Sequence, residues 1–242
     1  QLPHGLLAVS IATTFVPDLA RMFHRGDHQQ FSQTMASGIR LTALLTIPAS
    51  CGLWVMSKPI IGLLFQHGNF SAAATENTAR ALSGLAIGLA GFSVYLFVLR
   101  GFYARNDTRT PFFINVGENV INIVLAIVLV DRHGVFGLGL AFSIAYLVSA
   151  LVALLVLEST EVDIKLSELA FNIARISFAA GAMTYAVWFT IQYIGSDAGL
   201  GALTRVIAGT LIGVTTYVVA LSALGEKTMR DYLSSKITKS SR

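Results

Sequence analysis

The sequence predicts an all-α fold, a polytopic membrane bundle of about seven transmembrane helices. Three observations support this prediction. Only 12% of the residues are charged and 54% are hydrophobic, whereas roughly a quarter of the residues in a soluble domain are charged. Apolar blocks close to the length that crosses a bilayer recur along all 242 residues. Lys and Arg collect in alternate connections between these blocks, as membrane topology requires.

The apolar blocks define the predicted spans. A helix needs about 20 mainly apolar residues to cross about 30 Å of hydrocarbon. Six blocks near this length occupy residues 38–57, 77–99, 111–130, 135–157, 171–194 and 201–224. A shorter block, 1–16, precedes Pro17 and a polar segment. The chain opens without an initiator Met, a basic region or a cleavage site, so we expect it to begin inside a helix and not with a signal peptide. On this expectation, the chain corresponds to most of the carboxy-terminal half of a larger protein.

Basic residues divide unevenly between the two sides of the predicted bundle. Four of the 17 lie on one side, at Lys58, Arg80, Arg132 and Arg205. The other thirteen are Arg21, Arg25, Arg40, Arg100, Arg105, Arg109, Lys165, Arg175, Lys227, Arg230, Lys236, Lys239 and Arg242. Lys and Arg in short loops mark the cytoplasmic face. We therefore expect an inner-membrane protein with a cytoplasmic carboxy terminus and with cytoplasmic segments at 17–37, 100–110, 158–170 and 225–242.

The outward connections are then 58–76, 131–134 and 195–200. The last two are so short that consecutive helices must be antiparallel neighbours. The segment 58–76 begins near Pro59 and holds an apolar run too short to span, so it predicts a surface helix followed by a turn at His67-Gly68-Asn69. The stretch 159–170 predicts a second short interfacial helix.

Two pairs of glycines have the spacing that allows close helix contact. Gly84 with Gly88, and Gly209 with Gly213, each place two small residues on one helix face. Ordinary packing inside the bundle explains such pairs, and a homodimer face is the alternative.

Polar residues recur inside the span 111–130. Asn115, Glu118, Asn119 and Asn122 share one helical stripe because they are three or four residues apart. Polar groups at membrane depth usually face a cavity, which makes these residues candidates for a substrate site. The alternative is structural: Asn side chains hydrogen-bond neighbouring helices, and the Glu reaches the interface or pairs with an Arg.

Catalytic and metal motifs are not evident. The sequence contains no GxSxG, Walker or HExxH motif. Cys51 is the only cysteine, and His24 with His28 has the spacing of a metal pair but no third ligand nearby. We therefore predict no catalytic residues, no metal and no cofactor. Because the basic residues sit beside membrane ends and not on one compact face, we also predict no nucleic-acid partner.

Three stretches together resemble one family. QLPHGLLAVSIATTFVPDLAR, RLTALLTIPASCGLWVMSKPIIGLLFQHGNF and LRGFYARNDTRTPFFINVGENVINIVL are similar, in order and spacing, to the eighth to eleventh helices of the MviN/MurJ lipid II flippases. The other three spans match that family's last three helices. The phrases LFQHGNF and GFYARNDTRTP are the most specific parts of this resemblance within its exporter superfamily.

The resemblance implies a second lobe over 1–157 and two additional helices with a cytoplasmic tail over 158–242. The implied function is flipping of lipid II, the undecaprenyl-pyrophosphate-linked peptidoglycan precursor, by alternating access. Lipid II and membrane lipids would be the partners. The head of the cargo would enter a cavity lined by Ser10 of helix 1–16 and by the stripe from Asn115 to Asn122, and the last two helices would form a lateral groove for its polyprenyl tail.

The resemblance has two departures and leaves three alternatives. The family's essential cavity arginines precede the position of Gln1, and one turn after Asn122 stands Ala126 in place of the carboxylate with which some relatives bind a cation. The nearest alternative is another exporter of the superfamily, for polysaccharide lipids or drugs. The others are a membrane glycosyltransferase, which would need an acidic surface motif, and a membrane scaffold that transports nothing.

Overall fold

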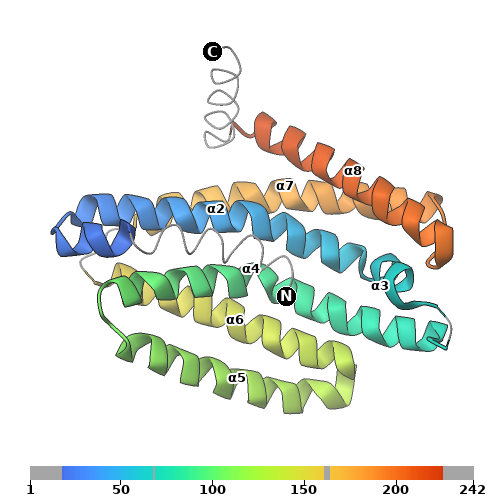
Figure 1. Cartoon of the computed structure of the whole chain (residues 1–242), viewed down its shortest axis with the longest axis horizontal. Helices are drawn as coiled ribbons and strands as arrows, with labels where there is room; N and C mark the ends of the chain where they lie inside the picture. The colour runs from blue at the N-terminus through green and yellow to red at the C-terminus, as the bar shows by residue number, and fades with distance from the viewer. Residues whose placement is uncertain (1–17, 68, 161–163, 226–242) are drawn as a thin grey trace.

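The computed structural model describes residues 18–67, 69–160 and 164–225. This part of the chain is helical and contains no strand. After a short helical stretch at 18–24, the elements are α2 (His28–Val55), α3 (Ser57–Phe65), α4 (Ala72–Ala104), α5 (Arg109–His133), α6 (Val135–Glu158), α7 (Leu166–Tyr193) and α8 (Gly199–Ala223) (Figure 1). The predicted fold class is therefore confirmed, and the block 1–16 lies outside the described residues.

Several helices extend beyond the apolar blocks that predicted them. Before α2, the Asp27 side chain accepts a hydrogen bond from the backbone N–H of Gln30. Before α4, the Ser71 hydroxyl accepts one from the N–H of Ala74. Such caps satisfy N–H groups that have no partner within the helix, so a helix can begin in polar sequence before its apolar stretch.

Within the described residues, five helices are long and apolar enough to cross a membrane: α2, α4, α5, α6 and α8. The sixth predicted span is present as the 28-residue α7, which does not meet the same criterion of composition. Its first three turns carry Glu168, Asn172 and Arg175, and its apolar part is interrupted by Thr and Tyr residues.

The connections alternate between the two ends of the bundle (Figure 1). The turns α4–α5 and α6–α7 lie at the end where α2 begins, and α3 and the turns α5–α6 and α7–α8 lie at the other. This arrangement separates the two sets of loops as the basic residues predicted. Because α2 and α7 begin at the same end, these two helices run parallel.

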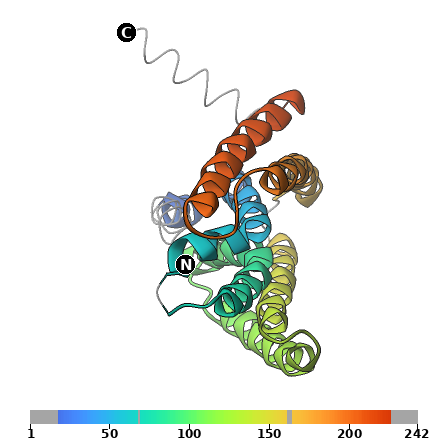
Figure 2. The ribbon, with the colours of Figure 1, turned by 90° about the vertical axis from the view of Figure 1, so that its right-hand side faces the viewer.

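The helices are stacked in the order α8, α7, α2, α4, α6, α5, which Figure 2 shows from the end. Phe31, Ile39, Val98 and Ile176 are among the fully buried residues of the core that connects the central helices. At one edge, α5 packs mainly against α6 and buries little of its apolar segment.

Close contact between α4 and α6 explains the first glycine pair. A Cβ on Gly84 would lie 2.7 Å from the Phe136 carbonyl oxygen, and a Cβ on Gly88 would overlap the backbone of Ser143. The Ser143 hydroxyl donates a 2.6 Å hydrogen bond to the Gly84 carbonyl. Gly84 and Gly88 therefore allow packing inside the bundle, which is the first of the two interpretations above.

The two predicted short helices have different outcomes. The helix within 58–76 is confirmed as α3, which packs against α4 and α8. The prediction of a separate helix over 159–170 is wrong, because Ser159 and Thr160 form a turn and α7 already begins at Leu166. Apolar residues at Leu166, Leu169 and Ile173 continue the helical spacing without a break, so nothing ends a short helix here.

Candidate functional site

The polar stripe of α5 forms the border between a buried and an exposed part of this helix. Asn115 and Asn119 are exposed, and Asn122 is half-buried. The Asn119 amide donates to the Asn115 backbone carbonyl at 2.8 Å, and its nitrogen lies 3.2 Å from the Asn115 side-chain oxygen. The stripe therefore keeps hydrogen-bonding groups on an accessible helix face. Ser10, the remaining predicted cavity residue, lies outside the described residues.

Glu118 lies on the side of the stripe that borders α4 and α6. Its exposed fraction is 2%, and it lies within electrostatic range of Tyr95 and Tyr146. The two tyrosine rings contact each other edge to face, with centroids 5.6 Å apart. Among the described residues, Glu118 has neither an ion pair nor a hydrogen bond. A buried carboxylate without a partner is costly, so it is uncommon in a region that only needs to be stable.

The Tyr95 hydroxyl lies in the same buried region as Glu118. It is buried and makes no hydrogen bond of ordinary geometry within the described residues, although the Asn115 side chain lies near it. The stripe thus joins an exposed amide pair to a buried group of tyrosines and one carboxylate.

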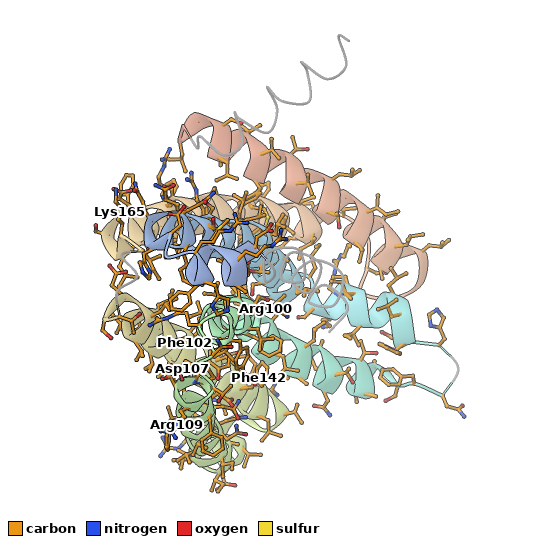
Figure 3. All side chains as sticks on the ribbon, turned by 60° about the vertical axis from the view of Figure 1, so that its left-hand side comes forward. Arg100, Phe102, Asp107, Arg109, Phe142 and Lys165 are labelled. Atoms are coloured by element: carbon orange, nitrogen blue, oxygen red, sulfur yellow. The ribbon has the colours of Figure 1, made fainter. Side chains whose placement is uncertain are left out.

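A polar turn connects α4 to α5 at the end of the stripe (Figure 3). Figure 3 shows Arg100, Asp107 and Arg109 at this end of the bundle. The Asp107 carboxylate accepts hydrogen bonds of 3.0 Å from the backbone N–H groups of Arg109 and Thr110. Hydrogen bonding from the Thr110 side chain and from these N–H groups lowers the pKa of Asp107. The carboxylate therefore stays ionised and holds the start of α5 in place.

An apolar groove of about 470 Å³ runs between α2, α7 and α8, on the side of the molecule where α3 lies. Its lining is almost entirely apolar, and includes Leu44, Pro48, Met56, Val187 and Tyr217. The second glycine pair, Gly209 and Gly213, also lines it. A Cβ on Gly209 would lie 2.6 Å from the Met56 sulfur, so these glycines provide room at the α8 side of the groove.

The two histidines of the possible metal pair pack against one aromatic ring. His24 and His28 both contact the Phe23 ring edge to face, with centroids 6.1 and 5.8 Å away. Within the described ranges, no group of three or more His, Cys, Asp or Glu side chains could hold a metal ion. The geometry of the described site is therefore that of a membrane bundle with one polar helix face and one apolar groove.

Comparison with known proteins assigns this architecture to a family. A family model described as "Lipid II flippase MurJ" matches residues 1–209. The chain belongs to the MurJ family of lipid II flippases. The match includes the polar stripe of α5 and most of the apolar groove, and it ends within α8.

Individual MurJ proteins agree with this assignment. The chain is 30% identical over 221 residues to a probable lipid II flippase MurJ of Rhizobium meliloti, and 31% identical over 220 residues to one of Thermotoga maritima. These alignments cover 91% and 90% of this chain but 41% and 42% of the relatives.

A solved structure is also similar. It is a lipid II flippase MurJ in an inward closed conformation, with a TM-score of 0.77 and 26% identity. The match covers 94% of this chain and 45% of the solved one. The chain thus spans less than half the length of the MurJ proteins that it matches, and it is a membrane protein of this family.

One feature was missed by the sequence analysis. A second, polar groove lies between the starts of α2 and α7. Gln29, Gln33 and Ser37 follow one another at intervals of four residues on α2. This spacing indicates a polar face on the first part of the helix. The spacing does not predict that α7 is the helix that packs beside this face.

Proposed function

We propose that the protein containing this chain flips lipid II across the bacterial cytoplasmic membrane by alternating access. The chain would supply the second lobe over 1–157, with two additional helices and a tail over 158–242. Membership of the MurJ family and the presence of both an apolar groove between α2, α7 and α8 and a polar face on α5 support this proposal. Lipid II itself combines a charged head with a long hydrocarbon tail, so it needs both kinds of surface.

The apolar groove is the observation that carries the proposal. Its walls come from α2 of the lobe and from the additional helices α7 and α8. An isoprenoid chain entering such a groove would bury apolar surface without leaving a polar group unsatisfied. We infer that the groove holds the polyprenyl tail while the head moves through the cavity between the lobes.

The cavity would be lined from this chain by Ser10, Asn115, Glu118, Asn119 and Asn122. The exposure of Asn115 and Asn119 supports this role, because an amide pair at membrane depth is favourable only beside water, protein or a polar ligand. We propose that the chain contributes no catalytic residue, since moving a lipid requires differential binding in two conformations and breaks no bond.

The orientation follows from the basic residues. Arg21, Arg25, Arg105 and Lys165 lie at the end of the bundle where α2 and α7 begin, and we propose that this end is cytoplasmic. The tail after residue 225 would then also be cytoplasmic.

Depletion of the full-length protein in living cells tests the proposal. Lipid II in the outer leaflet should fall within the depletion time, and lipid II in the inner leaflet should accumulate. If lipid II still reached the outer leaflet at the normal rate, the proposed function would be wrong. A cargo competition with polysaccharide lipids and small cationic drugs separates the other exporters of the superfamily, because only those exporters would respond.

A further inference from the structure

The carboxyl group of Glu118 lies deep inside the span formed by α5. It comes nine residues after Arg109, the first residue of this helix, which corresponds to about 13.5 Å at 1.5 Å per residue. The Glu118 side chain is too short to reach the polar turn before α5 from this depth. Only 2% of its surface is exposed, so the described helices already enclose the carboxyl group.

Neutral groups surround this carboxyl. Tyr95 on α4 and Tyr146 on α6 are the titratable groups that face it from the two neighbouring helices, and their ring centroids are 5.6 Å apart. Asn115, one turn earlier on α5, lies near the Tyr95 hydroxyl. In the part of the chain that the structure describes, no Lys, Arg or His side chain pairs with Glu118. An ionised Glu118 would therefore be a buried charge without a counter-ion, which is costly.

A proton on Glu118 would remove this cost and supply a missing hydrogen bond. The Tyr95 hydroxyl is buried and has no hydrogen-bond partner of ordinary geometry among the residues described. A protonated carboxyl has an O–H donor as well as an acceptor oxygen, whereas a carboxylate can only accept. The Glu118 O–H can therefore donate to the Tyr95 oxygen, so that one proton satisfies two groups in the same buried region.

The polar stripe offers this carboxyl a path to water. Asn115 and Asn119 are exposed on the accessible face of α5, and the Asn119 amide donates to the Asn115 carbonyl at 2.8 Å. The helix α5 packs mainly against α6, and its contact with α4 is small (Figure 1). A shift of α5 away from α4 would therefore break few contacts and would place the carboxyl on the same hydrated surface as the amides.

We propose that Glu118 is a reversible proton-binding site. Its carboxyl holds a proton while α5 is packed against α4 and α6, and gives this proton to water when α5 moves away and the carboxyl becomes hydrated. The carboxyl O–H bond is the only bond that forms or breaks, and water supplies and accepts the proton. The contribution of this proton to the movement of a lipid rests on the proposed function, whereas the proton site itself does not.

Infrared spectroscopy of the purified full-length protein tests the proton site directly. A protonated carboxyl has a C=O stretching band that a carboxylate lacks. At neutral pH the unchanged protein should show such a band, and Glu118→Gln should remove it. The matched control is Glu168→Gln, because Glu168 is 70% exposed and lies 3.5 Å from the Lys165 ammonium, and this variant should keep the band. If the spectrum of Glu118→Gln kept the band, the proposal would be wrong.

A second variant tests the hydrogen bond and assigns the band. Tyr95→Phe removes the hydroxyl that accepts from Glu118, so the band should move to the higher frequency of a carboxyl with fewer hydrogen bonds. Tyr103→Phe is the control, because Tyr103 on the same helix is 49% exposed, and it should leave the band in place. A band that stayed in place in Tyr95→Phe would contradict the assigned hydrogen bond.

Exchange into D2O keeps the test valid if a thermal melt shows that Glu118→Gln has failed to fold. The band of the unchanged protein must then shift to lower frequency as deuterium replaces the carboxyl proton, and its movement in Tyr95→Phe assigns it to Glu118. Absence of any band that responds to D2O would overturn the proposal.

Proteoliposomes separate the proton site from the proposed function. With a pH gradient across the membrane, the rate at which the unchanged full-length protein moves lipid II should change severalfold when the gradient is reversed. Glu118→Gln should respond to neither direction. Equal rates of the unchanged protein under both gradients would contradict release of the proton during the cycle. A protein that shows the infrared band but moves no lipid II under any gradient would instead contradict the proposed function.

Discussion

The hydroxyl of Tyr217 on α8 donates a 2.7 Å hydrogen bond to the backbone carbonyl of Leu44 on α2. In a regular helix this carbonyl would accept from the N–H of the residue four positions later. That residue is Pro48, which has no N–H. Tyr217 therefore supplies the donor that Pro48 lacks, and all three residues line the apolar groove.

Replacement of Tyr217 by Phe should destabilise the protein. The variant leaves the buried Leu44 carbonyl without its donor, which costs about 1–3 kcal/mol. We expect a lower midpoint of thermal unfolding for the purified full-length protein in detergent. Tyr185→Phe is the matched control, because Tyr185 lies on α7 with 67% of its surface exposed, and it should leave the midpoint unchanged.

A double variant tests the reason for this effect. Pro48→Ala restores a backbone N–H four residues after Leu44, so Tyr217→Phe should cost much less in that background than in the unchanged protein. An equal loss in both backgrounds would show that the hydroxyl does not compensate for the proline.

Packing of α4 against α6 should be sensitive to a single methyl group. Gly88→Ala places a Cβ against the backbone of Ser143, which cannot move aside as a flexible side chain can. Overpacking of this kind costs about 1–3 kcal/mol. Gly117→Ala on α5 is the control, because nothing lies within 4 Å of the added methyl. Thermal unfolding should separate the two variants, and equal midpoints would contradict the tight contact.

An ion pair network at the α3 end should make a small contribution that depends on pH. The Lys58 ammonium lies 3.2 Å from Glu76 and 3.4 Å from Asp197, and Asp197 also pairs with Arg205. A hydrogen bond with Glu76, followed by the charge of Asp197, raises the pKa of Lys58 above its usual value of 10.5. Because the pKa is higher in the folded state, the stabilisation is complete below the unfolded pKa and is lost as pH rises through the folded pKa.

The corresponding variant is Lys58→Met. Since the side chain is half exposed, solvent screening limits the effect to about 0.5–1 kcal/mol. The difference in unfolding free energy from the unchanged protein should be constant between neutral pH and about pH 9 and should shrink above pH 10.5. Arg80→Gln, at an exposed position on α4, should show no such dependence. A difference that grows with rising pH would contradict the assigned partners.

Glu118→Gln separates a functional role from a structural one. Glutamine has nearly the same shape and removes the cost of burying a charge, so the midpoint of thermal unfolding should be equal or higher. If Glu118 serves the cavity, the rate at which lipid II reaches the outer leaflet should nevertheless fall severalfold. A stable variant that flips at the normal rate would restrict Glu118 to a structural role.

Helix positions could be predicted because each depends on local sequence. The apolar blocks locate all six described long helices, and the only errors are at the ends, where caps such as Asp27 and Ser71 extend helices into polar sequence. The interfacial helix over 159–170 was wrong for a related reason, since its apolar residues belong to the first turns of α7.

Contacts between distant segments could not be predicted in the same way. The spacing of Gly84 and Gly88 indicates a close approach, but only the structure identifies α6 as the neighbour. Pro48 shows that the Leu44 carbonyl lacks its usual donor within α2. The hydroxyl that replaces this donor belongs to Tyr217, which is 173 residues from Leu44, so the sequence does not indicate the contact. The stripe from Asn115 to Asn122 could be placed on one face, but its division into an exposed amide pair and a buried Glu118 depends on how α5 packs against α6.

The most direct test of the proposed function is to obstruct the apolar groove in the full-length protein. Thr210 lines the groove, whereas Ile207 on the same helix is 51% exposed and does not. Each would be replaced by Trp in cells depleted of the unchanged protein, and lipid II in the outer leaflet would be measured at equal protein levels. We predict that Thr210→Trp lowers the flipping rate at least tenfold while Ile207→Trp preserves it. Equal, normal rates for both variants would contradict the assignment of this groove to the tail of the cargo.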